Sequence, residues 1–249
     1  MLGKLETLQF AGRAIHVYTP PSYHAANDGL FPVVYVQDGS YLFADSIDDL
    51  ERDFTAGLTQ EVIFVGIEPH NRYREYTPWF APRLRPEESF DGEGDSYLAF
   101  VTEQVSPFIK ANYRVLNDAS HTGITGGSLG ALISLIAAYK KPGYFGRIAL
   151  MSASFWYVSA LEFIEEHEFK QDQLRIYMYV GELEAAGRGN IQEKMVPNTR
   201  KAYELLKNKV PGGSGQIKFE TDPEGVHEHR YFNQYFPNAM RFVYPGPNA

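Results

Sequence analysis

The stretch GITGGSLGALISLIAAY, Gly123 to Tyr139, joins a short run of small and β-branched residues to an apolar helical pattern. Between the two halves stands Ser128, in the string Gly-x-Ser-x-Gly. We expect a strand over 122–125 and a helix over 129–139, joined by a sharp turn at the serine. A strand–turn–helix unit of this kind is the setting that a nucleophilic serine requires.

The glycines around Ser128 suit such a turn. Gly126 and Gly130 leave room where a Cβ atom would clash, because the serine itself must adopt strained backbone angles. The start of the following helix would lend partial positive charge, and the N–H group of Leu129, to a developing oxyanion. The alternative is a glycine-rich turn without chemistry.

Strands and helices alternate along the rest of the chain. Apolar runs at 31–37 and 61–67 read as strands buried on both faces, which is typical of a parallel sheet. An antiparallel hairpin over 5–18 is expected at a sheet edge. The remaining expected elements are strands at 147–151, 174–180 and 216–220 and helices at 46–56, 95–113, 159–169, 197–210 and 229–244. The sequence therefore predicts a doubly wound, mostly parallel α/β sheet in a single domain, 1–249.

Composition excludes several kinds of site and partner. The 249 residues include 31 acidic and 23 basic side chains, and the net charge of -8 argues against nucleic acid or an anionic membrane as partner. Cysteine is absent, which excludes disulfides, thiolate metal sites and a cysteine nucleophile. The start, MLGKLETLQF, lacks a signal-peptide pattern, and no apolar run reaches the length of a membrane span. We therefore expect a cytoplasmic protein.

A serine nucleophile needs a base that is itself oriented by an acid. The histidines that follow Ser128 are His167, His227 and His229. His167 stands in the charged string EEHEF and is expected to be a solvated residue of a helix. His227 lies in a loop between the last strand and the closing helix, where a base belongs in such a sheet. His229 is expected in the first helical turn, pointing elsewhere, so we favour His227.

The acid is expected after the strand at 174–180, where the string GELE contains Glu182 and Glu184. Spacing alone does not separate these two carboxylates. A second oxyanion N–H group is expected from the loop Asp38-Gly39-Ser40, because a glycine there lets the backbone approach the substrate closely. The alternative for this loop is an ordinary Asp-Gly turn.

The segment 68–93 shows no strand or helical period and is rich in proline, arginine and aromatic residues. Long irregular segments in compact domains are usually functional or disordered, and its aromatic residues argue against disorder. Its candidates for binding an anionic, catechol-bearing ester by charge and stacking are Arg72, Arg74, Tyr76 and Trp79. The alternative is structural, with an arginine paired to Glu75 that fastens the segment.

With these residues in place, the chain resembles the putative-esterase family of α/β hydrolases. That family includes the enterochelin and bacillibactin trilactone esterases, feruloyl esterases, esterase D and the mycolyltransferases. The resemblance runs from about Arg13 to Phe242 and rests on an ordered set of blocks: VVYVQDG, RYREYTPW, GITGGSLGALISL, SASFWY, YVGELEA and GVHEHRYFNQYFP. It implies an α/β-hydrolase fold, without a large lid because the segment from Ser154 to Leu174 is short.

The resemblance also implies roles for individual residues. Ser128 would be the nucleophile, and His227 the base, because the family's histidine follows Gly-x and stands ten residues before a proline, here Pro237. The family pattern Gly-x-x-acid points to Glu184. The second oxyanion N–H group would belong to Ser40.

The family's aromatic block after the next strand matches Phe155, Trp156 and Tyr157, which would line the acyl pocket. The site would be open and would tolerate bulky substrates.

These residues predict hydrolysis of a carboxylic ester through a serine acyl-enzyme, with no metal or cofactor. The expected substrate is a small-molecule ester, with a siderophore trilactone or another bulky aromatic ester as the candidate. One alternative is an acyltransferase that uses the same triad. The other is a hydrolase-fold binding protein without activity, against which the presence of Ser128, His227 and Glu184 argues. Neither the natural ester nor the oligomeric state follows from the sequence.

Overall fold

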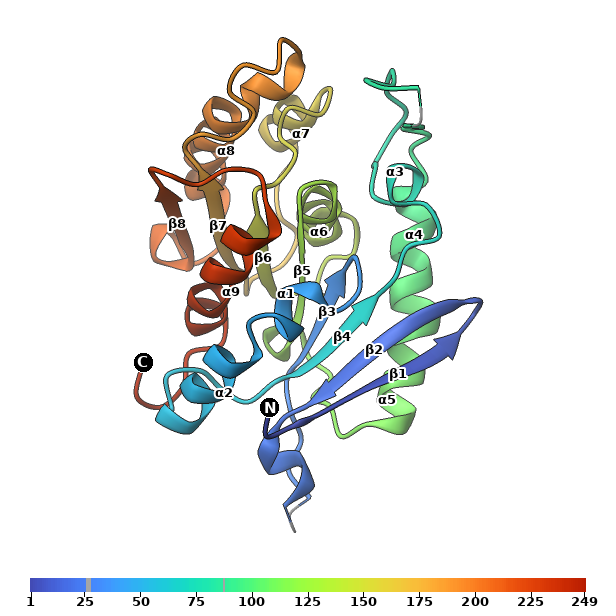
Figure 1. Ribbon diagram of the computed structural model, residues 1–249, viewed down its shortest axis with the longest axis vertical. Helices are drawn as coiled ribbons and strands as arrows, with labels where there is room; N and C mark the ends of the chain where they lie inside the picture. Colours follow the sequence, from blue (N-terminus) through green and yellow to red (C-terminus); the bar gives the residue numbers. More distant parts are fainter. Residues whose placement is uncertain (26–27, 87) are drawn as a thin grey trace.

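A computed structural model describes residues 1–25, 28–86 and 88–249. Within these ranges the strands form one 8-stranded sheet in the order β1-β2-β4-β3-β5-β6-β7-β8 (Figure 1). β1 and β2 form an antiparallel hairpin at one edge, and β2 also pairs antiparallel with β4. The other neighbours pair in parallel. The predicted mostly parallel α/β sheet with an antiparallel N-terminal hairpin is confirmed.

The expected strands and helices are found near their expected bounds, whereas two short helices, at 41–44 and 72–75, were not expected. The strands are β1 Lys4–Phe10, β2 Arg13–Thr19, β3 Val33–Gln37, β4 Ile63–Ile67, β5 Thr122–Gly127, β6 Arg147–Met151, β7 Arg175–Gly181 and β8 Ile217–Asp222. The α-helices are α1 Tyr41–Ala44, α2 Ile47–Ala56, α3 Arg72–Glu75, α4 Gly94–Phe100, α5 Ser106–Asn112, α6 Leu129–Lys140, α7 Ala160–Glu166, α8 Met195–Lys209 and α9 His229–Val243. A π-helical turn, Val101–Val105, joins α4 to α5.

Three helices differ from the expected ranges by more than one residue at an end or by an interruption. The helix expected over 95–113 contains the π-helical turn. The helix expected over 159–169 ends at Glu166, because the backbone becomes extended at His167. α8 begins at Met195, two residues before the expected start at Pro197. A proline is tolerated in the first turn of a helix, where its missing N–H would have no partner within the helix.

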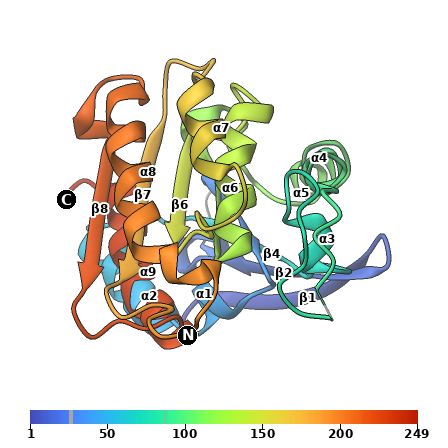
Figure 2. The ribbon, with the colours of Figure 1, turned by 90° about the horizontal axis from the view of Figure 1, so that it is seen from above.

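The sheet is covered on both faces. Figure 2 shows α6, α7 and α8 on one face and α1, α2 and α9 on the other. The apolar run of β3 shows why: Val33 and Tyr35 belong to the core on one face, while Val34 and Val36 belong to the core on the other. Alternating side chains that are all buried produce a continuous apolar strand. In the described residues α7 is the only α-helix between β6 and β7, so no large lid is present there.

The parallel strands bring the candidate residues to one edge. Ser40, Ser128, Glu184 and His227 lie in the connections that follow β3, β5, β7 and β8, respectively. Carboxyl ends of parallel strands meet at the same edge of a sheet, where ligands bind in open α/β folds. The topology therefore directs the search for a site to this edge.

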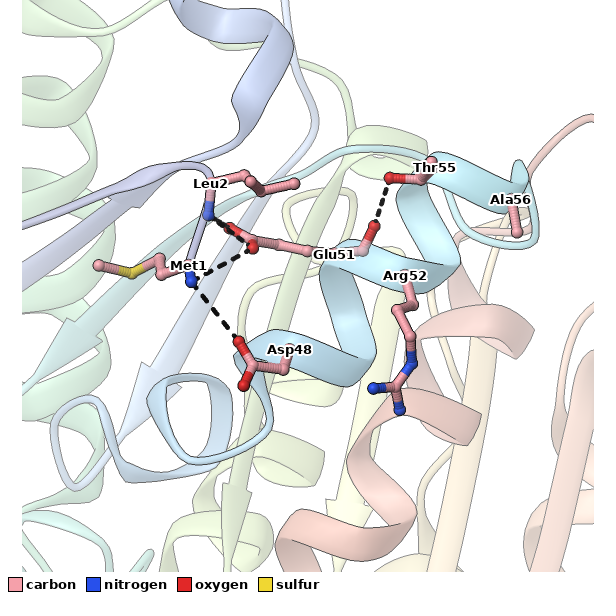
Figure 3. Close-up of a pocket in the computed structure, with 7 residues that line it drawn as sticks. All are labelled: Met1, Leu2, Asp48, Glu51, Arg52, Thr55 and Ala56. Carbon is pink, nitrogen blue, oxygen red and sulfur yellow. Dashed lines mark hydrogen bonds and ion pairs between the residues drawn. The ribbon is translucent and has the colours of Figure 1, made fainter.

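One cavity lies away from this edge of the sheet, where the amino-terminal residues pack on α2 (Figure 3). This cavity of 720 Å³ is lined by Met1, Leu2, Asp48, Glu51, Arg52, Thr55 and Ala56. The buried carboxylate of Glu51 accepts hydrogen bonds from the N–H groups of Leu2 and Gly3 and from the hydroxyl of Tyr18. No candidate site residue lines it. In the described part of the chain, no helix is both long and apolar enough to cross a membrane.

Candidate active site

Ser128 stands at the turn between β5 and α6 with φ 59° and ψ -119°. A positive φ is strained for any residue with a Cβ atom, so the surrounding structure must hold it. The N–H group of Ser128 donates to the carbonyl of Met151 at 2.9 Å, and its carbonyl accepts from the N–H group of Ser154 at 3.1 Å. The end of β6 and the loop after it thus hold the backbone of the serine on both sides.

The flanking glycines are required by close packing at the turn. A Cβ atom on Gly126 would lie 2.7 Å from the carbonyl carbon of Gly130 and 2.8 Å from Cβ of Gln37. A Cβ atom on Gly130 would lie 2.9 Å from the same carbon of Gln37. All three contacts are shorter than Cβ atoms tolerate, so α6 could not approach β3 this closely with larger residues.

His227 and Glu184 form a direct hydrogen bond. Nδ1 of His227 donates to Oε2 of Glu184 at 2.7 Å, and the glutamate side chain is fully buried. The two loops are also joined by backbone bonds, because the N–H group of Leu183 donates to the carbonyl of Gly225 at 2.9 Å. Gly181 and Gly225 touch, and a Cβ atom on Gly181 would lie 2.4 Å from the carbonyl carbon of Gly225.

The structure separates the two carboxylates that spacing left equal. Glu182 points away from the histidine and pairs with Arg200 of α8. The hydrogen bond from Arg200 lowers the pKa of Glu182. Its side chain is partly exposed, which is typical of a surface ion pair. Of the two, only Glu184 contacts His227.

Ser128 and His227 open into one cavity of 480 Å³. Its lining consists of Asp38, Tyr41, Arg72, Gly127, Ser128, His227, His229 and Phe232. The hydroxyl of Ser128 lies 3.2 Å from the hydroxyl of Ser154, which is the one side-chain partner it has among the described residues. Phe232 packs edge-on against the ring of His227, with centroids 5.2 Å apart. Serine and histidine therefore share a cavity without a hydrogen bond between them in this state.

The expectation that His229 points elsewhere is wrong. It begins α9 and lines the same cavity, where its ring stacks on Tyr41 with centroids 4.1 Å apart. The cause is that α9, which begins at His229, packs on α1, which begins at Tyr41. His167 behaves as a surface residue, although it follows α7 rather than lying within it, and its Nδ1 atom is 2.9 Å from the carbonyl of Phe163.

The predicted oxyanion donors, Leu129 and Ser40, have N–H groups without an acceptor among the residues that the structure describes. Leu129 is the first residue of α6, where N–H groups have no partner within the helix. Ser40 precedes α1. The N–H groups of the two preceding residues already have acceptors: Gly39 donates to the carbonyl of Ile67, and Asp38 donates to the hydroxyl of Tyr76.

Among the candidates in the segment 68–93, Arg72 lies in the cavity. Its Nε and Nη2 atoms donate to the two carboxylate oxygens of Asp38 at 3.0 and 3.2 Å. Burial disfavours the charge of Arg72, but the carboxylate of Asp38 outweighs it by charge and hydrogen bonding and raises the pKa of the guanidinium. The arginine is therefore held charged beside the serine.

Arg74 and Trp79 lie outside the cavity. Arg74 pairs with Asp91 at 3.0 Å and also with Glu93, so the partner suggested for it, Glu75, is wrong. Glu75 instead binds Arg13 of β2 at 2.9 Å. These pairs fasten the segment, as the structural alternative requires, but with other partners.

Aromatic residues of the segment 68–93 and of the loop after β6 line a separate, apolar cavity of 260 Å³. It is lined by Ala81, Pro82, Leu84, Phe90, Trp156, Tyr157, Val158 and Ile191. The indole N–H of Trp79 donates to the carbonyl of Val158 at 2.8 Å and so fastens the wall of this cavity. Trp156, predicted to line the acyl pocket, is thus in a neighbouring cavity and not in the one that contains Ser128.

Several residues of the site were not singled out from sequence. Ser152 and Ser154 contact Glu184 and Ser128, respectively, and Tyr41 and Phe232 line the cavity. The position of SAS directly after a parallel strand was the available signal for the two serines. In residues 1–25, 28–86 and 88–249, no three or more histidine, aspartate or glutamate side chains come together as they would to hold a metal ion.

Residues 11–243 match the family described as "Putative esterase". The chain belongs to the putative esterase family. The chain is similar to the uncharacterized protein YbbA of Bacillus subtilis, with 38% identity over 245 residues, 98% of this chain and 97% of that one. The siderophore enterobactin esterase of Emericella nidulans is 27% identical over 140 residues, 50% of this chain and 46% of that one.

The fold is shared with solved structures as well. The IroE-like serine hydrolase from Shewanella oneidensis superimposes with a TM-score of 0.80 at 20% identity, over 97% of this chain and 80% of that chain. The α/β-hydrolase fold implied by the resemblance is thereby confirmed. Membership of the putative esterase family supports an esterase that acts on small-molecule esters.

Proposed function

We propose that this esterase hydrolyses carboxylic esters through a serine acyl-enzyme, with Ser128 as nucleophile, His227 as base and Glu184 as orienting acid. The observation that carries the proposal is the 2.7 Å hydrogen bond between His227 and the buried Glu184, beside a cavity shared with a serine at a strained turn. A serine hydroxyl gains nucleophilicity only from a base, and the base needs a fixed orientation.

The chemistry follows from these positions. Nδ1 of His227 donates to Glu184, which leaves Nε2 to accept the proton of Ser128 as Oγ attacks the ester carbonyl. The N–H groups of Leu129 and Ser40 would bind the oxyanion, each lowering the barrier by roughly 3 kcal/mol. His227 then returns the proton to the leaving alkoxide. Water attacks the acyl-enzyme by the same route and releases the acid.

Ser128 must change its hydrogen-bond partner before it reacts. Its hydroxyl lies 3.2 Å from Ser154, so rotation about the serine side chain has to bring it to His227. Catalytic hydrogen bonds often form only when substrate binds. Binding of the ester in the cavity would supply this change by displacing the hydroxyl from its resting position.

For the substrate, we propose a bulky aromatic ester with anionic character, of the siderophore trilactone class. The charged Arg72 lies in the cavity of Ser128, where it could bind an anionic group. Trp156 and Tyr157, which follow Ser154 in the same loop, line the apolar cavity. This cavity could hold an aromatic group of the substrate. A relative of the chain is named as a siderophore enterobactin esterase.

A short substrate panel tests the proposal: 4-nitrophenyl acetate, a feruloyl ester and a catecholate trilactone. Hydrolysis of all three is expected, with the highest kcat/KM for the trilactone. The Ser128→Ala variant should hydrolyse none of them. Failure of the wild type on every ester would contradict the proposed activity, whereas a preference for acetate would contradict only the proposed substrate class.

A further inference from the structure

The carboxylate of Glu184 is held on both of its oxygens. Oε2 accepts from His227, whereas Oε1 accepts from the hydroxyl of Ser152 at 2.5 Å and from the N–H group of Gly181 at 3.0 Å. The side chain of Glu184 is fully buried, so water cannot replace any of these donors. A buried charged group needs all of its hydrogen bonds.

Ser152 occupies an unusual position for this contact. It directly follows β6, is fully buried and has φ 52°. Its N–H group donates to the carbonyl of Tyr179 in the neighbouring strand β7 at 2.8 Å. Glycine would adopt this left-handed backbone without strain. A serine that keeps a strained backbone in the interior, with its hydroxyl on the acid, indicates that the hydroxyl itself is used.

We propose that Ser152 is a positioning residue for catalysis, which holds Glu184 so that Oε2 faces His227. The inference rests on the proposed function, because Ser152 acts through the acid and the base. It does not line the cavity of Ser128 and would not touch substrate. Its hydroxyl fills one acceptor site of Oε1, and Gly181 fills the other.

The loss of this hydroxyl has a defined consequence. The terminal torsion of a glutamate is broad, so a carboxylate with fewer partners can rotate. With Gly181 as the remaining donor to Oε1, Glu184 would leave the orientation in which Oε2 meets His227. The base would then be oriented less often when Ser128 attacks. Because substrate is not touched, kcat should fall while KM stays unchanged.

The test is Ser152→Gly, which removes the hydroxyl and also relieves the positive φ. Glycine accepts the backbone conformation, and this relief offsets part of the cost of taking one donor from the buried carboxylate of Glu184, so thermal unfolding should show a folded variant. We expect kcat for 4-nitrophenyl acetate to fall about 10- to 150-fold, the range of a charge-assisted hydrogen bond, at unchanged KM. A folded variant with wild-type kcat would overturn the inference.

Ser159→Gly is the matched control. Ser159 also has a positive φ, 59°, but it is exposed, precedes α7 and makes no side-chain hydrogen bond at that helix end. The same substitution there relieves the same strain without reaching Glu184. Activity should stay at the wild-type level. An equal loss in both variants would assign the effect to the backbone and overturn the role of the Ser152 hydroxyl.

A double-mutant cycle ties the effect to the acid. In the Glu184→Gln background, Ser152→Gly should lower kcat by less than about threefold, because the group that it positions has already been neutralised. A loss as large as in the wild-type background would overturn the proposal. The low-field ¹H resonance of the Nδ1–H of His227 gives a second measure, and it should weaken or shift in Ser152→Gly and stay unchanged in Ser159→Gly.

The proposed function fails separately from this inference. Wild-type protein that neither hydrolyses 4-nitrophenyl acetate nor reacts with a fluorophosphonate at Ser128 would contradict the acyl-enzyme mechanism. Active wild type together with an unaffected Ser152→Gly variant would contradict only the positioning role of Ser152.

Discussion

Nδ1 of His227 lies 2.7 Å from Oε2 of Glu184, although 43 positions separate the two residues along the chain. They follow β8 and β7, which are neighbours in the sheet and pair in parallel. The pair is therefore a product of topology, since two adjacent parallel strands place their following loops side by side. The close contact of Gly181 with Gly225 completes the approach.

The two carboxylates after β7 should differ sharply in their effect on catalysis. Glu184→Gln should lower kcat by about three to four orders of magnitude, because the imidazole loses the anion that orients it. Glu182→Gln is the matched control and should change kcat little, because it breaks a surface pair with Arg200 and leaves His227 untouched. Steady-state kinetics of both variants with 4-nitrophenyl acetate measures this; the reverse order would assign the acid to Glu182.

The two histidines that line the cavity of Ser128 should also differ in their effect on catalysis. His227→Ala should abolish hydrolysis, because it removes the base. His229→Ala should retain most of kcat, because His229 stacks on Tyr41 and does not contact Glu184. The measurement is kcat/KM of each variant across the substrate panel. Comparable losses from both substitutions on every ester would contradict the assignment of a single base.

Gly225 should be required although it carries no chemistry. A Cβ atom there would lie 2.6 Å from Cα of Gly181, so Gly225→Ala must push the loops of Glu184 and His227 apart. Overpacking of this kind costs about 1–3 kcal/mol of stability, and a shift of the base should lower kcat at least tenfold. Gly215→Ala is the control, because a Cβ atom there meets nothing within 4 Å. Thermal unfolding and kcat give both readouts, and a fully active Gly225→Ala variant would refute this account of loop placement.

Arg72 should contribute to the binding of anionic esters. Arg72→Ala should raise KM for a catecholate trilactone about 10- to 150-fold and leave KM for 4-nitrophenyl acetate nearly unchanged, because the neutral ester has no charge to lose. Arg74→Ala is the control: it breaks surface pairs with Asp91 and Glu93 and should leave both KM values unchanged.

The removal of Arg72 also leaves Asp38 without its partner. The double variant Asp38→Asn with Arg72→Ala separates the lost cation from the exposed anion, and it should keep a raised KM for the trilactone. An equal loss on both esters, together with lower thermal stability, would show that Arg72 has a structural role only.

The sheet and the approach of the candidate residues could be predicted because local patterns carry them. The apolar runs of β3 and β4 and the turn at Ser128 are visible in consecutive residues, and the carboxyl edge follows from parallel pairing. The same logic led to His227. Single-domain organisation over 1–249 and a cytoplasmic location remain predictions.

Side-chain partners could not be predicted from spacing. Trp156 lines the apolar cavity together with Val158, whose carbonyl accepts a hydrogen bond from the indole of Trp79, far away in sequence. Arg72 and Arg74 lie two positions apart in one short helix, yet Arg72 pairs with Asp38 and Arg74 with Asp91. The choice between Glu182 and Glu184 likewise depends on Arg200 and on the loop after β8. Such contacts are set by tertiary packing.

The central claim is that Ser128 is the nucleophile, and covalent labelling tests it most directly. Wild-type protein incubated with a fluorophosphonate should gain one adduct, which peptide mass spectrometry should locate at Ser128, together with loss of hydrolysis of 4-nitrophenyl acetate. Ser128→Ala should fold with unchanged thermal stability and take up no label. An adduct on another serine, or hydrolysis that persists in Ser128→Ala, would contradict the account.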